Sequence, residues 1–503
     1  MSGLFGTLNT ATKGLNAQQT ALQTIGHNVA NANTTGYTRQ RVTMQADLAQ
    51  SVAGVGQIGT GVRIGNIDRV SDQYVNTQLR DAHSTTEKHK ALSDIIGQLE
   101  ATFNEPSDTG LSNQISEVFN AWTYLASNPE QASARTMLVQ TTETFTDTIH
   151  HMANSMNSLH KDTLNELDKS ALDANSTLKQ LENLNHQIWQ ASVRGFTPND
   201  LLDQQDRLLT DLAGKVDITV ERDSFNRVSV DVAGTNVLDS SSRKELAVVT
   251  KEENGTFYLS NGDSVEGPEG ESLIGKVIVK NEDGSATFIN PQKGSMKGTQ
   301  DALEVLSDMQ SDLNEFAFSF ATAVNLIHSN GGDYDNGGVD FFNNGELTKE
   351  NAALTIRVSE SLRKNPENVV SGKDLNNTFS GDGSRAQAIS GLQYQNLSLN
   401  SESWAFNQDS MKIEGSGVGS TLFSRYNSMV TKMGIVKQQE DNMLDTQSAL
   451  MHLLTQRRES ISGVDINEEV VDMIKYSSAF QANARVLQTI SDMLDTLINR
   501  TGV

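Results

Sequence analysis

The stretch that decides the fold is residues 21–42, ALQTIGHNVANANTTGYTRQRV, because a helical pattern stops inside it. Leu22, Ile25 and Val29 continue an apolar helix face, and a run of Asn, Thr and Gly residues from Asn31 to Gly36 follows. Asn and Gly are typical of helix C-termini and turns. The stretch could be a ligand loop, a catalytic turn or a joint between two structural elements.

Upstream of this stretch, apolar residues repeat every seven positions, which predicts a coiled-coil helix. One seam is Leu8, Leu15, Leu22 and Val29, and the second is Leu4, Ala11, Gln18 and Ile25. The outer face is polar but almost uncharged, with Asn9, Thr12, Asn16, Gln19 and Gln23. Because the helix lacks the ion pairs that support solvated coiled coils, we expect it to be marginally stable alone.

The C-terminal forty residues show the same seven-residue period. One seam is Ile466, Met473, Phe480, Leu487 and Leu494, and the other is Tyr476, Ile490 and Leu497 with Asn483 as a polar interruption. Asp465 is the expected N-cap, with Glu468 and Glu469 in the first turn. Two separate amphipathic helices would give this pattern too. We favour a pairing of the two seams, since both lie at the ends of the chain.

The segments between the two ends predict a multidomain α+β protein. Residues 71–194 read as long helices broken at 104–110 and 127–131, and a further helix ends near residue 214. Alternating strands and an NEDGS hairpin signal fill residues 215–291. Helix returns at 298–331, mixed chain runs to about 391, and helices dominate from residue 403. The predicted segments are 1–70 (coiled coil), 71–214 (helical), 215–291 (inserted antiparallel β domain), 292–460 (helical and mixed) and 461–503 (coiled-coil helix pairing with the first). This nested order predicts an elongated molecule with both termini at one pole and the β insertion at the other.

Composition excludes several classes of function. The chain of 503 residues carries a formal charge of −24, which argues against nucleic acid and anionic membranes as partners. It contains no cysteine, so disulfides, thiol nucleophiles and Cys-based metal sites are excluded. No apolar run is long enough to span a bilayer, and the N-terminus lacks the features of a cleaved signal peptide. We therefore expect a cytoplasmic protein, or one that leaves without signal cleavage.

No motif of a known catalytic or cofactor site occurs, so we predict no enzyme activity, no cofactor and no metal. His150, His151 and His160 read as solvated helix residues. The segment GGDYDNGGVDFF places Asp333, Asp335 and Asp340 around a pair of glycines, an arrangement that resembles half of a calcium loop. The twelfth position counted from Asp333 is Asn344 rather than Glu, so an Asx/Gly turn is the favoured interpretation.

Both ends of the chain resemble the bacterial flagellar axial proteins, the family of rod, hook and junction subunits. The resemblance rests on ALQTIGHNVANANTTGYTRQRV at the N-terminus and on GVDINEEVVDMIKYSSAFQANARVLQTISDMLDTLIN at the C-terminus. The TRQRV continuation is similar to the hook–filament junction members. Thr35 stands where a Pro is frequent, and Gly36 keeps the turn plausible. The matching residues within the turn are Asn28, Asn31, Asn33, Gly36 and Tyr37.

The resemblance implies a secreted structural subunit of the flagellum that is exported unfolded through the type III channel, without signal cleavage. It implies a homo-oligomer that assembles through its terminal helices, contacts the hook protein and a second junction protein, and is shielded at its C-terminal helix by a cytoplasmic chaperone. The polar face of the first helix would give a wet wall for the central channel. Three alternatives remain: another axial protein (hook or distal rod), a peptidoglycan hydrolase on a flagellar scaffold, and a calcium-dependent adhesin. Nothing around residues 28–42 supplies a nucleophile with its base, so we interpret that stretch as a joint.

Overall fold

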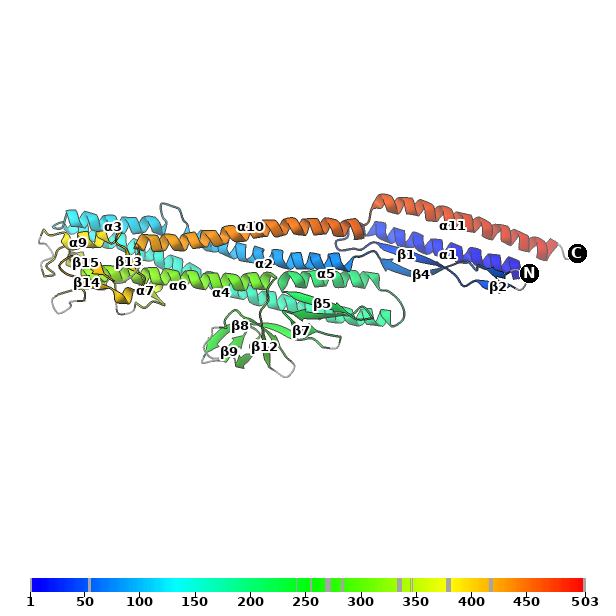
Figure 1. Ribbon diagram of the computed structural model, residues 1–503, viewed down its shortest axis with the longest axis horizontal. Coiled ribbons are helices and arrows are strands. Elements are labelled where there is room, and N and C mark those ends of the chain that lie inside the picture. The colour runs from blue at the N-terminus through cyan, green and yellow to red at the C-terminus, as the bar shows by residue number, and fades with distance from the viewer. Residues whose placement is uncertain are drawn as a thin grey trace.

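The computed structural model shows an elongated molecule with both chain ends at one pole (Figure 1). The structure describes residues 2–52, 56–240, 242–253, 256–266, 273–281, 285–332, 337–343, 345, 347–376, 381–415 and 419–500. Long helices at both ends of the chain and an inserted antiparallel β region confirm the predicted α+β class. The β insertion lies on the flank of the body, however (Figure 1). The far pole is formed by α3 (Leu111–Ser127), α9 (Ser384–Gly391) and the hairpin of β14 (Ala405–Asn407) and β15 (Lys412–Glu414) (Figure 1). The prediction that the insertion forms the opposite pole is wrong, because the helices around it continue past it.

The pole with the termini is built from α1 (Ser2–Ala30), α11 (Ile466–Asp495) and a short turn of π-helix (Thr496–Arg500). Between α1 and the body, the chain forms strands that the sequence analysis did not predict: β1 (Gln40–Ala46), β2 (Gln50–Val52), β3 (Gly56–Ile58) and β4 (Val62–Arg69). β1 pairs with β4 and β2 with β3, both antiparallel. This arm packs along α1 and has a largely exposed surface, so its strands lack the alternating apolar pattern that would have revealed them. We call α1, α11 and this arm the terminal unit.

The body is a layer of helices, and these helices begin and end at the capping and turn residues of the sequence. Asp72 caps α2 (Gln73–Phe103) by accepting from the backbone N–H groups of Tyr74 and Val75, and Asn104 ends it in a left-handed conformation. The predicted interruptions at 104–110 and 127–131 are confirmed by α3 (Leu111–Ser127) and α4 (Ala132–Ser192). The further helices are α5 (Asn199–Lys215), α6 (Ser295–His328), α7 (Ala352–Thr355), α8 (Glu360–Lys364), α9 (Ser384–Gly391) and α10 (Leu422–Ser462), with 3-10 turns at Pro366–Asn368 and Ser401–Ser403.

The main core lies where α3, α4, α6 and α10 meet. Aromatic rings fill it, with Phe145 and Phe320 at a centroid distance of 4.7 Å and Trp122 and Phe341 at 5.0 Å. Each fully buried ring contributes roughly 1.5–3 kcal/mol of hydrophobic stabilisation. Phe342 is held by the Asn325 side chain, which donates to its carbonyl and accepts from its N–H. The end of the segment GGDYDNGGVDFF is therefore a core anchor.

The insertion contains two antiparallel sheets. The first has the order β5-β6-β7 and the second the order β10-β9-β8-β11-β12. The strands are β5 (Ile218–Arg222), β6 (Val228–Val232), β7 (Thr235–Leu238), β8 (Glu245–Glu253), β9 (Thr256–Leu259), β10 (Ser264–Glu266), β11 (Val277–Lys280) and β12 (Ala286–Ile289). The β11–β12 pairing confirms the predicted hairpin, and the middle of its turn lies outside the described residues.

The prediction that helices dominate from residue 403 is wrong for its first part. Residues before α10 form short strands instead: β13 (Leu397–Ser398), β14 (Ala405–Asn407), β15 (Lys412–Glu414) and β16 (Gly419–Ser420). β14 and β15 pair as a hairpin, in which the side chain of Asn407 accepts from the N–H groups of Asp409 and Ser410. Such Asx turns compete with helix locally. In the described part of the chain, no helix is long and apolar enough to cross a membrane.

Candidate functional site

The two chain ends form a pair of long helices, α1 and α11, which run antiparallel and lie side by side over their length (Figure 1). The most deeply buried residues of α1 are mostly small: Ala11, Ala17 and Ala21 are 1–4% exposed, and Gly14 is also buried. A Cβ at Gly14 would come within 2.8 Å of the Asn483 amide oxygen. The two helices therefore approach closely at Gly14, where α1 has no side chain.

The predicted leucine seam of α1 flanks this contact rather than filling it. Ile25 is buried at 5% exposure, whereas Leu4, Leu8, Leu15, Leu22 and Val29 are only half-buried. In α11, Ile490 is buried and Tyr476, Phe480, Leu487 and Leu494 are half-buried. Ile466, Met473 and Leu497 are exposed. The heptad pattern thus identified the two helices that pair. Within a single chain, however, only some of the apolar residues at the heptad positions are buried.

α11 also carries apolar side chains that this chain leaves exposed. They are large side chains that are 44–65% exposed, and they occur in both halves of the helix: Val470, Val471, Ile474, Val486 and Met493. Ile498 in the following turn is 65% exposed. Together with the exposed Ile466, Met473 and Leu497 they form what we call the outer stripe. Several large apolar side chains exposed on one helix of a soluble protein indicate an interaction site.

The joint at the end of α1 is organised by the side chain of Asn28, which is 1% exposed. Its amide nitrogen donates to the Gln40 carbonyl at 2.9 Å and to the Glu469 carboxylate at 3.0 Å. Its amide oxygen accepts from the Tyr37 hydroxyl at 2.8 Å and from the Gln40 N–H at 3.0 Å. One buried side chain therefore ties α1, β1 and α11 together, with its hydrogen-bonding capacity filled.

The turn after α1 follows the sequence prediction in part. The Asn31 amide donates to the His27 carbonyl at 3.0 Å and so caps the helix end, whereas Asn33 is exposed. Gly36 has a φ of 76°, in the left-handed region, and a Cβ there would lie 2.7 Å from side-chain carbons of Arg207. Burial and the nearby carboxylates of Asp200, Asp203 and Glu469 raise the pKa of Tyr37, so its hydroxyl stays a neutral donor. The joint therefore needs both the glycine and the phenol.

Ion pairs close the joint against α11. Arg39 donates to Glu468 and Glu469, each at 2.7 Å, and its backbone N–H donates to the Ser462 carbonyl at the end of α10. Burial lowers the pKa of Arg39, but the two carboxylates outweigh that effect and raise it overall. The predicted N-cap Asp465 accepts from the N–H of Asn467. Glu469 is 2% exposed, so it is a buried partner of Arg39 and not only a helix-dipole residue. Arg41, in contrast, is exposed.

A further set of contacts, which the sequence analysis missed, fastens the arm to the body. Arg69 at the end of β4 lies 2.8 Å from both Asp203 and Asp206 of α5, and Asp203 also accepts from the Thr38 N–H. The Gln40 side chain donates to Asp200 at 2.9 Å. These partners lie more than 120 residues apart in sequence, so no local pattern could have paired them. The joint is therefore anchored on three sides, by α1, α11 and α5.

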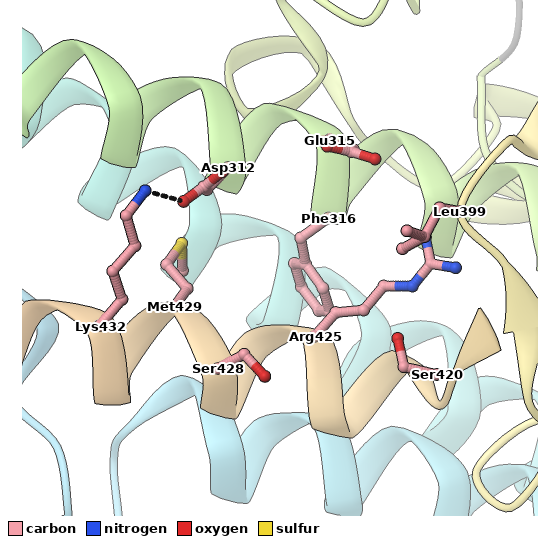
Figure 2. Close-up of a pocket in the computed structure, with 9 residues that line it drawn as sticks. All are labelled: Asp312, Glu315, Phe316, Leu399, Ser420, Arg425, Ser428, Met429 and Lys432. Atoms are coloured by element: carbon pink, nitrogen blue, oxygen red, sulfur yellow. Dashed lines mark hydrogen bonds and ion pairs between the residues drawn. The ribbon is translucent and has the colours of Figure 1, made fainter. Parts of the chain in front are cut away.

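The cavity drawn in Figure 2 lies between α6 and α10, with a volume of about 270 Å³. Its floor contains Phe316 and Met429, both nearly fully buried. Lys432 reaches across the mouth to Asp312 at 3.4 Å, and Arg425 extends along the opposite side (Figure 2). The cavity is a helix–helix seam closed by an ion pair, and its lining contains no histidine or cysteine that could serve a nucleophilic mechanism.

The remaining candidates for metal binding are three histidines of α4 and the aspartates of the segment GGDYDNGGVDFF. His151 is exposed and His150 and His160 are half-buried on α4; burial lowers the pKa of His160. Asp333 and Asp335 lie outside the described residues, as does Asn344. The carbonyl of Asp340 accepts from the Ser359 hydroxyl. Among the residues that the structure describes, no group of three or more His, Cys, Asp or Glu side chains could hold a metal ion.

Comparisons with known proteins agree along the whole chain. Residues 96–342 match the family described as flagellar hook-associated protein FlgK helical domain. Residues 8–38 match the flagella basal body rod protein family, and residues 455–500 match the C-terminal family of the flagellar basal body rod FlgEFG proteins. The chain ends thus match axial families, and the helical body matches a hook-associated one.

Full-length relatives and a solved structure extend this result. Flagellar hook-associated protein 1 of Bacillus subtilis is 29% identical, with 100% of this chain and 99% of the relative covered. The protein of that name from Salmonella typhimurium is 25% identical, with 98% and 99% covered. The flagellar hook junction protein FlgK from Burkholderia pseudomallei has a similar fold, with a TM-score of 0.60 at 15% identity over 76% of this chain and 100% of that one.

Proposed function

Because the chain belongs to the flagellar hook-associated protein 1 family, we propose that it is the subunit that joins the hook to the filament and permits filament assembly. The chain is a structural protein of the flagellum and not an enzyme. The observation that carries the proposal is the pairing of the two chain ends into one unit that leaves apolar side chains uncovered, since such a unit is completed only by neighbours.

The terminal unit would polymerise through the outer stripe and the half-buried leucines of α1. A side chain that is about half exposed gains roughly 1 kcal/mol when a neighbour covers it. The outer stripe and the leucines number about a dozen residues, so contacts with adjacent copies would stabilise a ring or helical junction strongly. The same stripe on α11 is the surface that a cytoplasmic chaperone would cover before export.

The opposite, polar face of α1 would line a central channel. Asn9, Thr12, Asn16, Gln19 and Gln23 are all exposed, as that role requires. Neutral amide and hydroxyl groups hold water and carry no charge that would bind a passing unfolded chain. The absence of cysteine suits export of an unfolded chain through the flagellar type III channel. The hook protein and a second junction protein would be its neighbours on either side, outside the cell.

Within the same family group, a hook or distal rod protein is the alternative. The families matched at the two ends are rod families, which is why the ends alone do not separate these functions. The match of residues 96–342 to the hook-associated helical domain favours the junction.

Deletion of the gene tests the proposed function. The deletion strain is expected to make hooks, to secrete filament protein into the medium and to lack filaments, because the hook would have no adaptor. Electron microscopy of the cell surface and a gel of the culture medium measure both effects. Filaments of normal number on the deletion strain would contradict the junction role, and loss of the hook itself would favour the hook or rod alternative.

A further inference from the structure

A groove runs between one face of α2 and the first strand of the β insertion. One wall is formed by residues of α2 at helical spacing, and the other by residues 217–220, which include the start of β5. The cavity has a volume of about 390 Å³, and Ala213 of α5 also lines it. The α2 residues are Tyr74, Thr77, Gln78, Arg80, Asp81 and Ser84. A space of this size holds a short segment of polypeptide rather than a single water molecule.

The strand side of the groove is an open sheet edge. β5 is the outermost strand of its sheet and pairs only with β6 within the described residues. The Asp217 carbonyl accepts from the Ala233 N–H, so the backbone of Asp217, and by alternation that of Thr219, faces β6. The N–H and C=O groups of Ile218 and Val220 therefore point to the groove. An edge of this kind is a template for another strand.

The helix side of the groove holds polar groups that the described chain leaves unsatisfied. Ser84 is 4% exposed, and neither its hydroxyl nor the amide oxygen of Gln78 has a hydrogen-bond partner in the structure. A buried polar group without a partner is costly, so such groups usually meet a ligand, a water or another chain. The pair needs both a donor and an acceptor, which a peptide group supplies.

Arg80 adds a charge requirement. Its guanidinium donates to the Thr77 hydroxyl at 3.1 Å, and no carboxylate among the described residues lies within ion-pair distance. Burial lowers its pKa and the neighbouring Arg222 acts in the same direction, whereas the Asp206 carboxylate, which lies beyond ion-pair distance, offsets only part of this effect. Residues 71–460 of the chain hold 55 acidic and 31 basic residues, so carboxylates are in excess over basic groups in the body.

We propose that the groove accepts an extended segment of a second copy of this chain, which adds as a strand to β5 and places a carboxylate against Arg80. A second copy fits for two reasons on the molecule itself. The body of a neighbouring copy carries the whole net charge of −24, so it offers carboxylates in excess. The groove also opens at Tyr74, in the first turn of α2 next to the joint, and so continues the assembly surface of the terminal unit. The inference rests on the proposed function, because it requires copies to lie side by side.

Photo-cross-linking in assembled flagella tests the inference. Tyr74 is 66% exposed at the groove, and a photoreactive benzoylphenylalanine in its place keeps an aromatic ring there. On irradiated hook–filament preparations we expect an adduct of two copies, which mass spectrometry maps to an extended segment of the second chain. Absence of any adduct, or an adduct with a different protein, would overturn the inference. Because the preparation comes from cells with working junctions, this failure is distinct from failure of the proposed function, which the deletion strain measures.

Three variants connect the adduct to the groove. Ser84→Ala removes one hydrogen bond to the segment and should lower the adduct yield about fivefold, and Arg80→Gln should lower it tenfold or more. Val220→Pro removes an outward N–H while leaving the bonds to β6, and should abolish the adduct. The matched controls are Ser176→Ala and Arg194→Gln, both at exposed positions. An adduct yield that none of the three variants changes would overturn the assignment of the groove.

Ser84→Ala also separates binding from folding. In the isolated chain the hydroxyl has no partner to lose, so its removal should leave the melting temperature unchanged or raise it. A melting temperature lowered by several degrees would mean that the hydroxyl serves the core of the single chain, and would overturn its role in accepting the segment.

Discussion

Replacing Asn28 with Asp leaves the number of heavy atoms at the joint unchanged, yet it should release α1 from β1 and α11. The substitution removes the two donors that reach the Gln40 carbonyl and the Glu469 carboxylate. The bond to a backbone carbonyl contributes about 1 kcal/mol and the bond to a carboxylate about 1.5–3 kcal/mol. The new carboxylate would also lie next to Glu469, which is 2% exposed.

The introduced carboxyl group destabilises the folded state whether it is ionised or protonated. Two like charges about 4 Å apart repel by about 4 kcal/mol at an effective dielectric constant near 20. If the new carboxyl group takes up a proton instead, keeping it neutral at pH 7 costs about 4 kcal/mol, since its ordinary pKa is near 3.9. Because a protonated carboxyl recovers one donor, we expect a total loss of about 5 kcal/mol, which is comparable to the whole stability of a small domain.

Hydrogen exchange measured by mass spectrometry on the isolated chain is the assay. In the parent chain, α1 and α11 should be protected; in the Asn28→Asp variant their amides should exchange at least a hundredfold faster, while α6 in the body stays unchanged. The control is Asn33→Asp, the same chemical change at an exposed position of the same turn. The loss of stability in the variant should shrink as the pH falls from 7 towards 4, because the pKa of the new carboxyl group is higher in the folded state than in the unfolded state. Protection of α1 within tenfold of the parent at pH 7 would refute the assignment of Asn28 as the centre of the joint.

Three further predictions concern the turn, the core and the channel face. Gly36→Val forces a β-branched residue to a φ of 76° and against Arg207, so it should abolish filament assembly without changing the circular-dichroism melt of the body, whereas Gly36→Ala should be milder; a motile Gly36→Val strain would contradict this. Burial lowers the pKa of His328 to about 4, so the body should lose about 3 kcal/mol as the pH falls from 6.5 to 4, and melts of His328→Gln should show a flatter pH dependence; equal slopes would exclude His328 as the cause. Asn16→Leu combined with Gln19→Leu should slow filament growth while junctions still form, and filaments of unchanged length would argue against a polar channel wall.

The fold was predictable from sequence where its pattern is local. The heptad periods identified α1 and α11, and the Asn104 and Asn128 breaks divided the helical body correctly, because helix ends depend on neighbouring residues. The alternating strands of the insertion followed for the same reason. The arm at residues 40–69 was missed because its strands are mostly exposed on both faces and show no apolar alternation.

The candidate site was predictable only in outline. The turn residues Asn28, Gly36 and Tyr37 were identified, but the distant partner of Asn28 was not, since Glu469 lies 441 residues further along the chain. Of the two predicted seams of α1, the leucine seam is only half-buried in the single chain, whereas Ala11 and Ile25 of the other seam are buried, as are Ala17, Ala21 and Gly14 outside both seams. A seven-residue period reports which faces are apolar; it does not distinguish burial within one chain from burial between chains.

The pairing of the two chain ends is the central claim, and an engineered disulfide tests it most directly. The chain has no cysteine, so Gly14→Cys combined with Asn483→Cys introduces the only two thiols, at positions in contact. The matched control is Gly14→Cys with Arg485→Cys, an exposed position nearby. After mild oxidation of purified chain and of assembled flagella, non-reducing gels and peptide mapping should show a disulfide within single chains for the first pair and not for the control. A disulfide that forms only between different chains, or equally in the control, would contradict the pairing.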